Sequence, residues 1–236
     1  NGHGTHVAGI IAGSGKGSNG KYRGIAPDTF LVSVKVLDKS GNGKIENVVE
    51  AAGWIIENKS AMNIRVVNIS FGTRAKMENG PAIETGEDDY ALIMAGGKMW
   101  DSGIVVVAAA GNNGPGNASV TAPGISKKII TVGAFDDKNF FSGRGPTREC
   151  IVKPEVVVTG SNIIACNNRQ GRYSSKSGTS MAAPVVSGAV ARLIKNNPDI
   201  TRKEVKIWMK SCCKKINVPS EKQGWGVLDI RKFVTG

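Results

Sequence analysis

The stretch of sequence that decides the fold is residues 104–110, IVVVAAA, followed directly by the turn sequence GNNG at residues 111–114. A short, wholly apolar run that ends in a turn is typical of a strand buried on both faces, as in parallel sheets. Residues 65–70 (RVVNIS) form a second such segment, and a glycine follows two positions later. Functional groups of parallel sheets collect at the carboxyl ends of the strands, so both following segments are candidate site segments.

Segments with helical spacing alternate with these strands. Apolar periodicity predicts helices over residues 45–58 and 90–100, and the small-residue segments 7–12 and 181–194 predict helices packed closely against their neighbours. This alternation predicts an α/β fold of three layers, with a mostly parallel central sheet flanked by helices. The chain has no internal repeat or linker, so residues 1–236 are expected to form one domain. Further strands are expected at residues 30–37 (FLVSVKVL), 129–132 and 156–165.

The composition excludes several classes of protein. The 236 residues are 40% hydrophobic and 21% charged, which is incompatible with intrinsic disorder. No apolar run reaches the ~18 residues that a membrane-spanning helix needs, so no membrane span is expected. The net charge is +12, but the basic residues are spread from Lys16 to Lys232, so no nucleic-acid partner is expected. The four cysteines are expected to be free, mostly buried thiols, with a Cys150–Cys166 disulfide as the alternative.

Ser180 is the first candidate for chemistry. It lies in residues 178–184 (GTSMAAP), at the start of a predicted helix. One interpretation is an N-cap, the commonest role for a serine at that place. The other is a nucleophile, because the free amides and the dipole of a helix N-terminus stabilise an oxyanion. The segment is not the G-x-S-x-G elbow of α/β-hydrolases, since Ala182 stands where the final glycine would be.

The two histidines, His3 and His6, both lie in residues 3–9 (HGTHVAG) and are the only ones in the chain. A zinc site is not expected, because no glutamate separates them and no third histidine exists. His3 precedes a predicted helix, where the positive end of the dipole favours a neutral imidazole that accepts a proton. A polar residue at a helix end is the alternative interpretation.

Together, residues 3–9 and 178–184 resemble the histidine and serine signatures of the subtilisin-like serine proteases, the subtilases of peptidase family S8. The resemblance spans the chain: residues 105–114 resemble the oxyanion-hole segment and residues 67–72 the strand beside the S1 pocket. It implies a subtilisin-like fold and a serine endopeptidase that cleaves protein or peptide substrates through an acyl-enzyme. Four further segments follow the family order, namely residues 24–27, 35–37, 153–155 and 224–229.

The resemblance implies a role for each matched residue. His3 is expected to be the general base, Ser180 the nucleophile and Asn112 the side-chain donor of the oxyanion hole, with His6 supporting the histidine motif. The substrate backbone is expected to pair with two edges of the protein. Because no acidic residue lies in the expected S1 walls, a neutral, apolar residue is expected before the scissile bond. The substrate-binding residues implied are Ser70, Phe71 and Gly72 at one edge, Gly41, Asn42 and Gly43 at the other, and Ala109, Ala110, Gly111 and Thr121 around the S1 pocket.

The sequence departs from the family pattern at the third member of the triad. In subtilases the aspartate precedes the histidine, and only two residues precede His3. The catalytic aspartate and its strand are therefore expected upstream of Asn1, and residues 1–236 alone are expected to be nearly inactive and poorly stable. Asp101 resembles the aspartate motif locally, but it lies at the amino end of the strand at 104–110 and is interpreted as a helix-terminating residue. A peptide-binding pseudoprotease or regulatory relative is the alternative function.

The resemblance also bears on metals, location and a possible insertion. Residues 13–23 occupy the place of a calcium loop in some relatives but contain no carboxylate, so calcium is not expected there. No cofactor is expected to be required, and a structural calcium elsewhere is left open. Residues 73–89 resemble an insertion, interpreted as a surface loop, with a role in substrate choice as the alternative. The resemblance implies a secreted or exported protein with an N-terminal propeptide as a partner.

Overall fold

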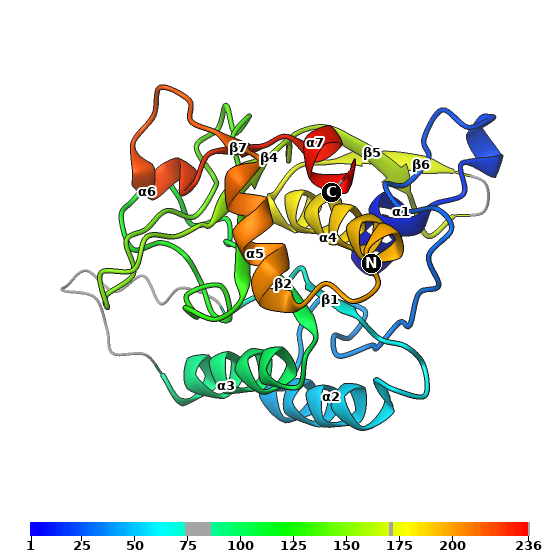
Figure 1. Cartoon of the computed structure of the whole chain (residues 1–236), viewed down its shortest axis with the longest axis horizontal. Coiled ribbons are helices and arrows are strands. Elements are labelled where there is room, and N and C mark those ends of the chain that lie inside the picture. The colour runs from blue at the N-terminus through cyan, green and yellow to red at the C-terminus, as the bar shows by residue number, and fades with distance from the viewer. Residues whose placement is uncertain (74–85, 170–171, 236) are drawn as a thin grey trace.

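The computed structural model of the chain (Figure 1) describes residues 1–73, 86–169 and 172–235. Helices and strands alternate along most of this length, as the sequence predicts. In chain order the elements are α1 (His3–Ala12), the 3-10 helix η1 (Lys16–Ser18), α2 (Ile45–Asn58), β1 (Val66–Ile69), α3 (Glu87–Asp101), β2 (Val105–Ala109), β3 (Ile130–Ala134), β4 (Val156–Val158), β5 (Ile163–Cys166), β6 (Tyr173–Lys176), α4 (Thr179–Asn196), α5 (Arg202–Ser211), β7 (Cys213–Lys214), α6 (Ser220–Gln223), β8 (Val227–Leu228) and α7 (Ile230–Thr235).

Six strands form the central sheet in the order β1-β2-β3-β4-β8-β7. All neighbouring strands run parallel except β7, which joins β8 in the antiparallel direction. β2 lies between β1 and β3 and is buried along its whole length, which explains why its sequence is apolar without alternation. The predicted α/β fold with a mostly parallel sheet is confirmed.

Helices cover both faces of this sheet (Figure 1). α4 packs across β1, β2 and β3 on one face, together with α1, whereas α2 and α3 pack against each other on the opposite face. The small residues of α4 permit close packing: a Cβ added at Gly188 would lie 2.7 Å from Cβ of Ile25. In the part of the chain that the structure describes, no helix is long and apolar enough to cross a membrane.

The prediction of a strand over residues 30–37 is wrong. These residues contain no strand, and the side chain of Phe30 is 99% exposed. Within the described ranges no other strand pairs with this segment, and β1 pairs only with β2. Its apolar alternation is suited to a strand, but a strand forms only where a neighbouring backbone supplies the hydrogen bonds. The β-rich stretch predicted at 156–165 divides into β4 of the central sheet and β5 of a separate two-stranded sheet with β6.

The four cysteines are free thiols, and the Cys150–Cys166 disulfide does not form. The expectation that they are mostly buried is wrong, because only Cys212 is buried. Cys150 is exposed, and Cys166 and Cys213 are half-buried. None of the four therefore stabilises the fold through a covalent bond.

A buried ion pair joins β3 to the segment that leads into β4. The Lys153 side chain is completely buried, and its Nζ donates to both carboxylate oxygens of Glu155 at 2.8 Å, to Oγ1 of Thr131 at 3.1 Å and to the carbonyl of Ile129 at 3.2 Å. Lys206 from α5 adds a second cation 2.9 Å from Glu155. Burial lowers the pKa of Lys153 from its ordinary value to about 8, against the opposing attraction of Glu155. Glu155 is therefore the counter-charge of both Lys153 and Lys206.

We predict that Glu155→Gln lowers the free energy of unfolding by about 3 kcal/mol or more, because it leaves the Lys153 amine buried without its counter-charge. The amide keeps the size of the side chain and an oxygen that accepts from the Thr131 N–H, so the loss reports the charge. Denaturant unfolding of the two proteins measures it. The exposed Glu149→Gln is the matched control and is expected to change stability by less than about 0.5 kcal/mol. Equal stability of wild type and Glu155→Gln would contradict the prediction.

Candidate active site

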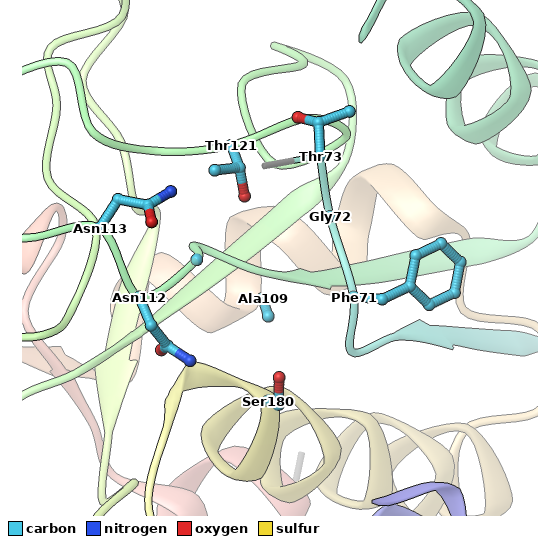
Figure 2. Close-up of a pocket in the computed structure, with 9 residues that line it drawn as sticks. Phe71, Gly72, Thr73, Ala109, Asn112, Asn113, Thr121 and Ser180 are labelled. Atoms are coloured by element: carbon cyan, nitrogen blue, oxygen red, sulfur yellow. The ribbon is translucent and has the colours of Figure 1, made fainter. Parts of the chain in front are cut away.

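A cavity of about 170 Å³ opens where β1 and β2 end, beside the first turn of α4 (Figure 2). Figure 2 shows Ser180 on one side of it and Thr121 on the other, with Asn112 and Phe71 to either side of Ala109. No charged residue lines it among the residues that the structure describes. The lining residues are Phe71, Gly72, Thr73, Ala109, Gly111, Asn112, Asn113, Thr121 and Ser180.

The structure brings most of the sequence-predicted residues to this cavity. Seven of the lining residues were expected at the site with a role. Asn113 lies in the candidate segment 111–114 but was given no role, and Thr73 was not expected. Ser70 lies behind the cavity, and Ala110 is fully buried. Gly41 does not line it and lies instead near the N-terminus, since a Cβ added there would be 3.1 Å from Nδ2 of Asn1. Asn42 and Gly43 belong to the same loop, away from the cavity lining.

Ser180 lies in the first turn of α4, directly after Thr179. Its hydroxyl donates to the carbonyl of Ser70 at 3.0 Å, and the Ser70 hydroxyl donates to the carbonyl of Ser180 at 3.0 Å. The backbone N–H of Ser180 has no partner within residues 1–73, 86–169 and 172–235. A free amide at the positive end of an 18-residue helix is suited to hold an anionic oxygen.

The orientation of the Asn112 amide is fixed by Thr179. Oδ1 of Asn112 accepts from the Thr179 N–H at 3.0 Å and from the Thr179 hydroxyl at 3.1 Å. Thr179 is fully buried, and its Oγ1 also accepts from the N–H of Gly111 at 3.1 Å. With Oδ1 occupied in this way, Nδ2 is the end of the amide that remains to donate, and it faces Ser180 in Figure 2. The side chain is therefore held as a donor before any ligand binds.

Two glycines allow the backbone to close tightly around Thr121. A Cβ added at Gly72 or at Gly111 would lie 2.6 Å from Oγ1 of Thr121, closer than two such atoms approach. Gly111 also has a positive φ of 92°, which a residue with a Cβ adopts only with strain. The wall of the cavity opposite Ser180 is thus made of backbone and one threonine.

His3 is the first residue of α1, one turn before His6. Burial, together with the nearby charges of Lys176 and His6, lowers the pKa of His3 below its ordinary value. The structure therefore favours the neutral imidazole, the form that accepts a proton. Within the described residues His3 makes no hydrogen bond to Ser180, whose hydroxyl donates to Ser70 instead.

His6 is buried and ties α1 to the β5–β6 hairpin. Its Nε2 lies 2.9 Å from the carbonyl of Ser174 and 3.1 Å from that of Ile163. Both partners are acceptors, so Nε2 must carry the proton. Burial lowers the pKa of His6, which keeps it neutral in this position. The geometry suits a structural role that fixes the first turns of α1.

No carboxylate in the described ranges lies in an ion pair or hydrogen bond with either imidazole. Asp101 is the last residue of α3, shortly before the amino end of β2, and pairs with Lys128 at 2.6 Å. It ends a helix, as the sequence analysis interpreted it.

Residues 13–23 contain no carboxylate side chain. In the described residues, no group of three or more His, Cys, Asp or Glu side chains is arranged to hold a metal ion. A structural calcium elsewhere stays open, as it did from the sequence. Most of the insertion-like stretch, residues 74–85, lies outside the described residues, so its two interpretations stay open. Thr73, which precedes it, lines the cavity.

Sequence reasoning missed Thr179 and Lys176. Thr179 stands between Gly178 and Ser180 in a segment already singled out, so its position in that segment was the available signal. Lys176 gave no signal, because it comes near His3 only through the packing of β5 against α1 and the pairing of β6 with β5. Asn68 was also missed: its Nδ2 donates to the Ser70 hydroxyl at 2.9 Å, and its Oδ1 accepts from Ser187 at 2.9 Å.

Comparison with known proteins gives one family. Residues 1–226 match the profile of the subtilase family, described as Peptidase S8. The chain is 39% identical over 237 residues to serine protease AprX of Bacillus subtilis (strain 168), covering 89% of this chain and 52% of that protein. It is 34% identical over 208 residues to subtilisin DY of Bacillus licheniformis, covering 87% and 68%.

Longer relatives and solved structures that this chain resembles include further proteases. The minor extracellular protease Epr of Bacillus subtilis (strain 168) is 30% identical over 237 residues, covering 100% of this chain and 33% of that protein. The chain thus spans about half of AprX and a third of Epr. The solved structure of sphericase superposes with a TM-score of 0.80 at 26% identity, covering 97% of this chain and 77% of that one. The S41 psychrophilic protease gives a TM-score of 0.79 at 27% identity, with the same coverage.

We predict that Lys176→Met raises the pKa of His3. The ammonium disfavours the imidazolium, so its removal moves the pH midpoint of the His3 titration upward, toward the ordinary value. NMR titration of the imidazole protons measures this in a chain with only two histidines. The matched control, Lys203→Met on the exposed face of α5, is expected to leave the midpoint unchanged. A downward or absent shift in Lys176→Met would contradict the prediction.

Proposed function

The chain belongs to the subtilase family, and from that premise we propose that it is a serine endopeptidase in which Ser180 is the nucleophile and His3 the general base. The observation that carries the proposal is the arrangement at the start of α4. There the Ser180 hydroxyl, the free Ser180 N–H and the Asn112 amide meet beside a neutral cavity. A hydroxyl next to two aimed donors is what acyl transfer requires.

Attack begins with proton transfer from the Ser180 hydroxyl. In the described structure that hydroxyl donates to the Ser70 carbonyl, so it must turn from Ser70 to His3 when substrate binds. His3 takes the proton as Oγ bonds to the scissile carbonyl carbon. The lowered pKa of His3 supports this step, because a neutral base is present over a wider range of pH.

The carbonyl oxygen of the substrate becomes negatively charged as the tetrahedral intermediate forms. Two donors are proposed to receive it, the backbone N–H of Ser180 and Nδ2 of Asn112. Thr179 holds the amide so that Nδ2 and not Oδ1 is presented, which avoids reorganisation during the reaction. Loss of one such donor costs about 2.7–4 kcal/mol of transition-state stabilisation, a magnitude known from this family.

Collapse of the intermediate breaks the C–N bond. His3, now an imidazolium, gives its proton to the leaving amine, and the acyl group stays on Ser180. Water then enters, loses a proton to His3 and attacks the acyl-enzyme. The second product leaves as a carboxylic acid, and Ser180 recovers its proton.

The third member of the triad is proposed to be an aspartate that precedes Asn1 in the full-length protein. The family order supports this, because the aspartate comes before the histidine. The edge position of β1 also supports it, because among the described residues β1 pairs with β2 alone, and a further parallel strand could pair with its other side. A carboxylate at His3 would orient the imidazole and stabilise the imidazolium, which is worth on the order of 10⁴ in kcat.

Substrates are proposed to be proteins or peptides with a neutral, apolar side chain before the scissile bond. That side chain would occupy the cavity between Ser180 and Thr121, where no charge is available to pair with Lys or Arg. The backbone would pair with the segment from Ser70 to Gly72. The extracellular character that Epr carries in its name supports export of this protein, and an N-terminal propeptide remains part of the proposal. No cofactor is proposed to be required.

The proposal is tested by labelling the full-length protein with a fluorophosphonate. We expect a single adduct on the tryptic peptide that contains Ser180, no adduct in Ser180→Ala, and normal labelling in the control Ser14→Ala, an exposed serine. Residues 1–236 expressed alone should label on the order of 10⁴-fold more slowly. Peptide binding without any labelling or cleavage would replace the enzyme with the pseudoprotease alternative.

We predict that cleavage of a peptide library favours neutral, apolar residues before the scissile bond over Lys or Arg by about tenfold or more in kcat/KM. The reason is that an unpaired cation loses hydration in an uncharged cavity. Mass spectrometry of the products reads the preference at each position. A strong preference for Lys or Arg would show that the proposed S1 cavity is misassigned.

A further inference from the structure

The β5–β6 hairpin leads into the active site and carries only positive charge. Between Ser161 and Thr179 the sequence contains Arg169, Arg172 and Lys176 but no Asp or Glu. Lys176 ends β6 and lies four residues before Ser180. In the part of the chain that the structure describes, its ammonium has no ion pair. This half-buried cation is therefore available to another partner.

The contacts of His6 place Lys176 beside the catalytic histidine. Lys176 is paired across the hairpin with Ile163, and the Ile163 carbonyl is 3.1 Å from Nε2 of His6. The Ser174 carbonyl, two residues before Lys176 on β6, holds the same nitrogen at 2.9 Å. His3 lies one turn before His6 on α1. The charge of Lys176 is near enough to lower the pKa of both imidazoles, which agrees with this placement.

The proposed chemistry determines which part of a substrate passes this hairpin. His3 must protonate the amine that leaves, so the residues after the scissile bond lie on the His3 side of Ser180. The residue before the scissile bond occupies the cavity on the other side, between Ser180 and Thr121. The segment that follows the scissile bond therefore approaches Lys176, whereas the segment that precedes it does not.

On the basis of the proposed function, we propose that Lys176 is a specificity-determining residue that selects substrates with Asp or Glu at the first or second position after the scissile bond. A carboxylate there would pair with an ammonium that has no ion pair within the described residues, and a lysine would be repelled by it. For charges that remain in contact with water, attraction and repulsion together amount to about three- to tenfold in kcat/KM.

The test uses the full-length protein and quenched fluorescent peptides that are identical before the scissile bond. They carry Asp, Ala or Lys at the first or the second position after it. Wild type is expected to cleave Asp peptides about three- to tenfold faster than Lys peptides in kcat/KM. Lys176→Glu should reverse the order, Lys176→Met should abolish it and Lys176→Arg should keep it. High salt should weaken the preference of wild type, because exposed charges are screened.

Two controls separate charge selection from a general loss of function. Lys203→Glu makes the same change of net charge on the exposed face of α5 and should keep the wild-type preference. A p-nitroanilide substrate has no residue after the scissile bond. The change that Lys176→Glu makes in its cleavage therefore reports the effect of the charge on His3 alone, and that effect cancels in the ratio of Asp to Lys peptides cleaved by one variant.

Equal cleavage of Asp and Lys peptides by wild type, or a preference that Lys176→Glu leaves unchanged, would overturn the inference while leaving the peptidase proposal intact. If no peptide is cleaved and Ser180 is not labelled, the peptidase proposal fails. Fluorescence anisotropy of the same peptides on Ser180→Ala then decides the inference. Tighter binding of Asp than of Lys peptides supports it, and equal binding overturns it.

Discussion

Ser70 and Ser180 exchange two hydrogen bonds of 3.0 Å, and these bonds join the carboxyl end of β1 to the first turn of α4. Asn68 extends the connection by donating to Ser70 and accepting from Ser187, two turns along the same helix. The start of α4 is therefore held against the sheet by side chains and backbone together. Because the cavity lies between this helix start and the strand ends, its shape depends on that join.

Once the start of α4 is held there, the polar groups of the site have few alternative orientations and hydrogen-bond partners. Thr179 is buried and fixes the Asn112 amide, and the Ser180 N–H has no backbone acceptor among the residues that the structure describes. The Nε2 proton of His6 is donated to two carbonyls of the β5–β6 hairpin. These hydrogen bonds fix the helix that begins at His3. These groups are held in place before a ligand arrives, and the proposed reaction requires only the Ser180 hydroxyl to turn.

The sequence predicts the sheet and its helices well because a strand that is buried on both faces consists almost wholly of apolar residues, as residues 104–110 do. It fails at residues 30–37, where the apolar pattern describes what a strand needs but not whether a neighbour is present. The candidate site divides in the same way. Ser180, His3 and Asn112 lie in recognisable local motifs, whereas Lys176 reaches the site through the pairing of β5 with β6, a contact that no local pattern encodes.

The crowding of Gly72 and Gly111 around Thr121 also limits how this cavity can evolve. Neither glycine position accepts a Cβ without displacing the opposite wall, so the pocket cannot be narrowed or charged from there. Variation is left to the side chains that already point inward, chiefly Thr121 and Ala109. In the proposed function, adaptation to a new side chain before the scissile bond therefore has a small set of mutational routes. Selection of the residues after the scissile bond is less restricted, because Lys176 on the hairpin is half-exposed.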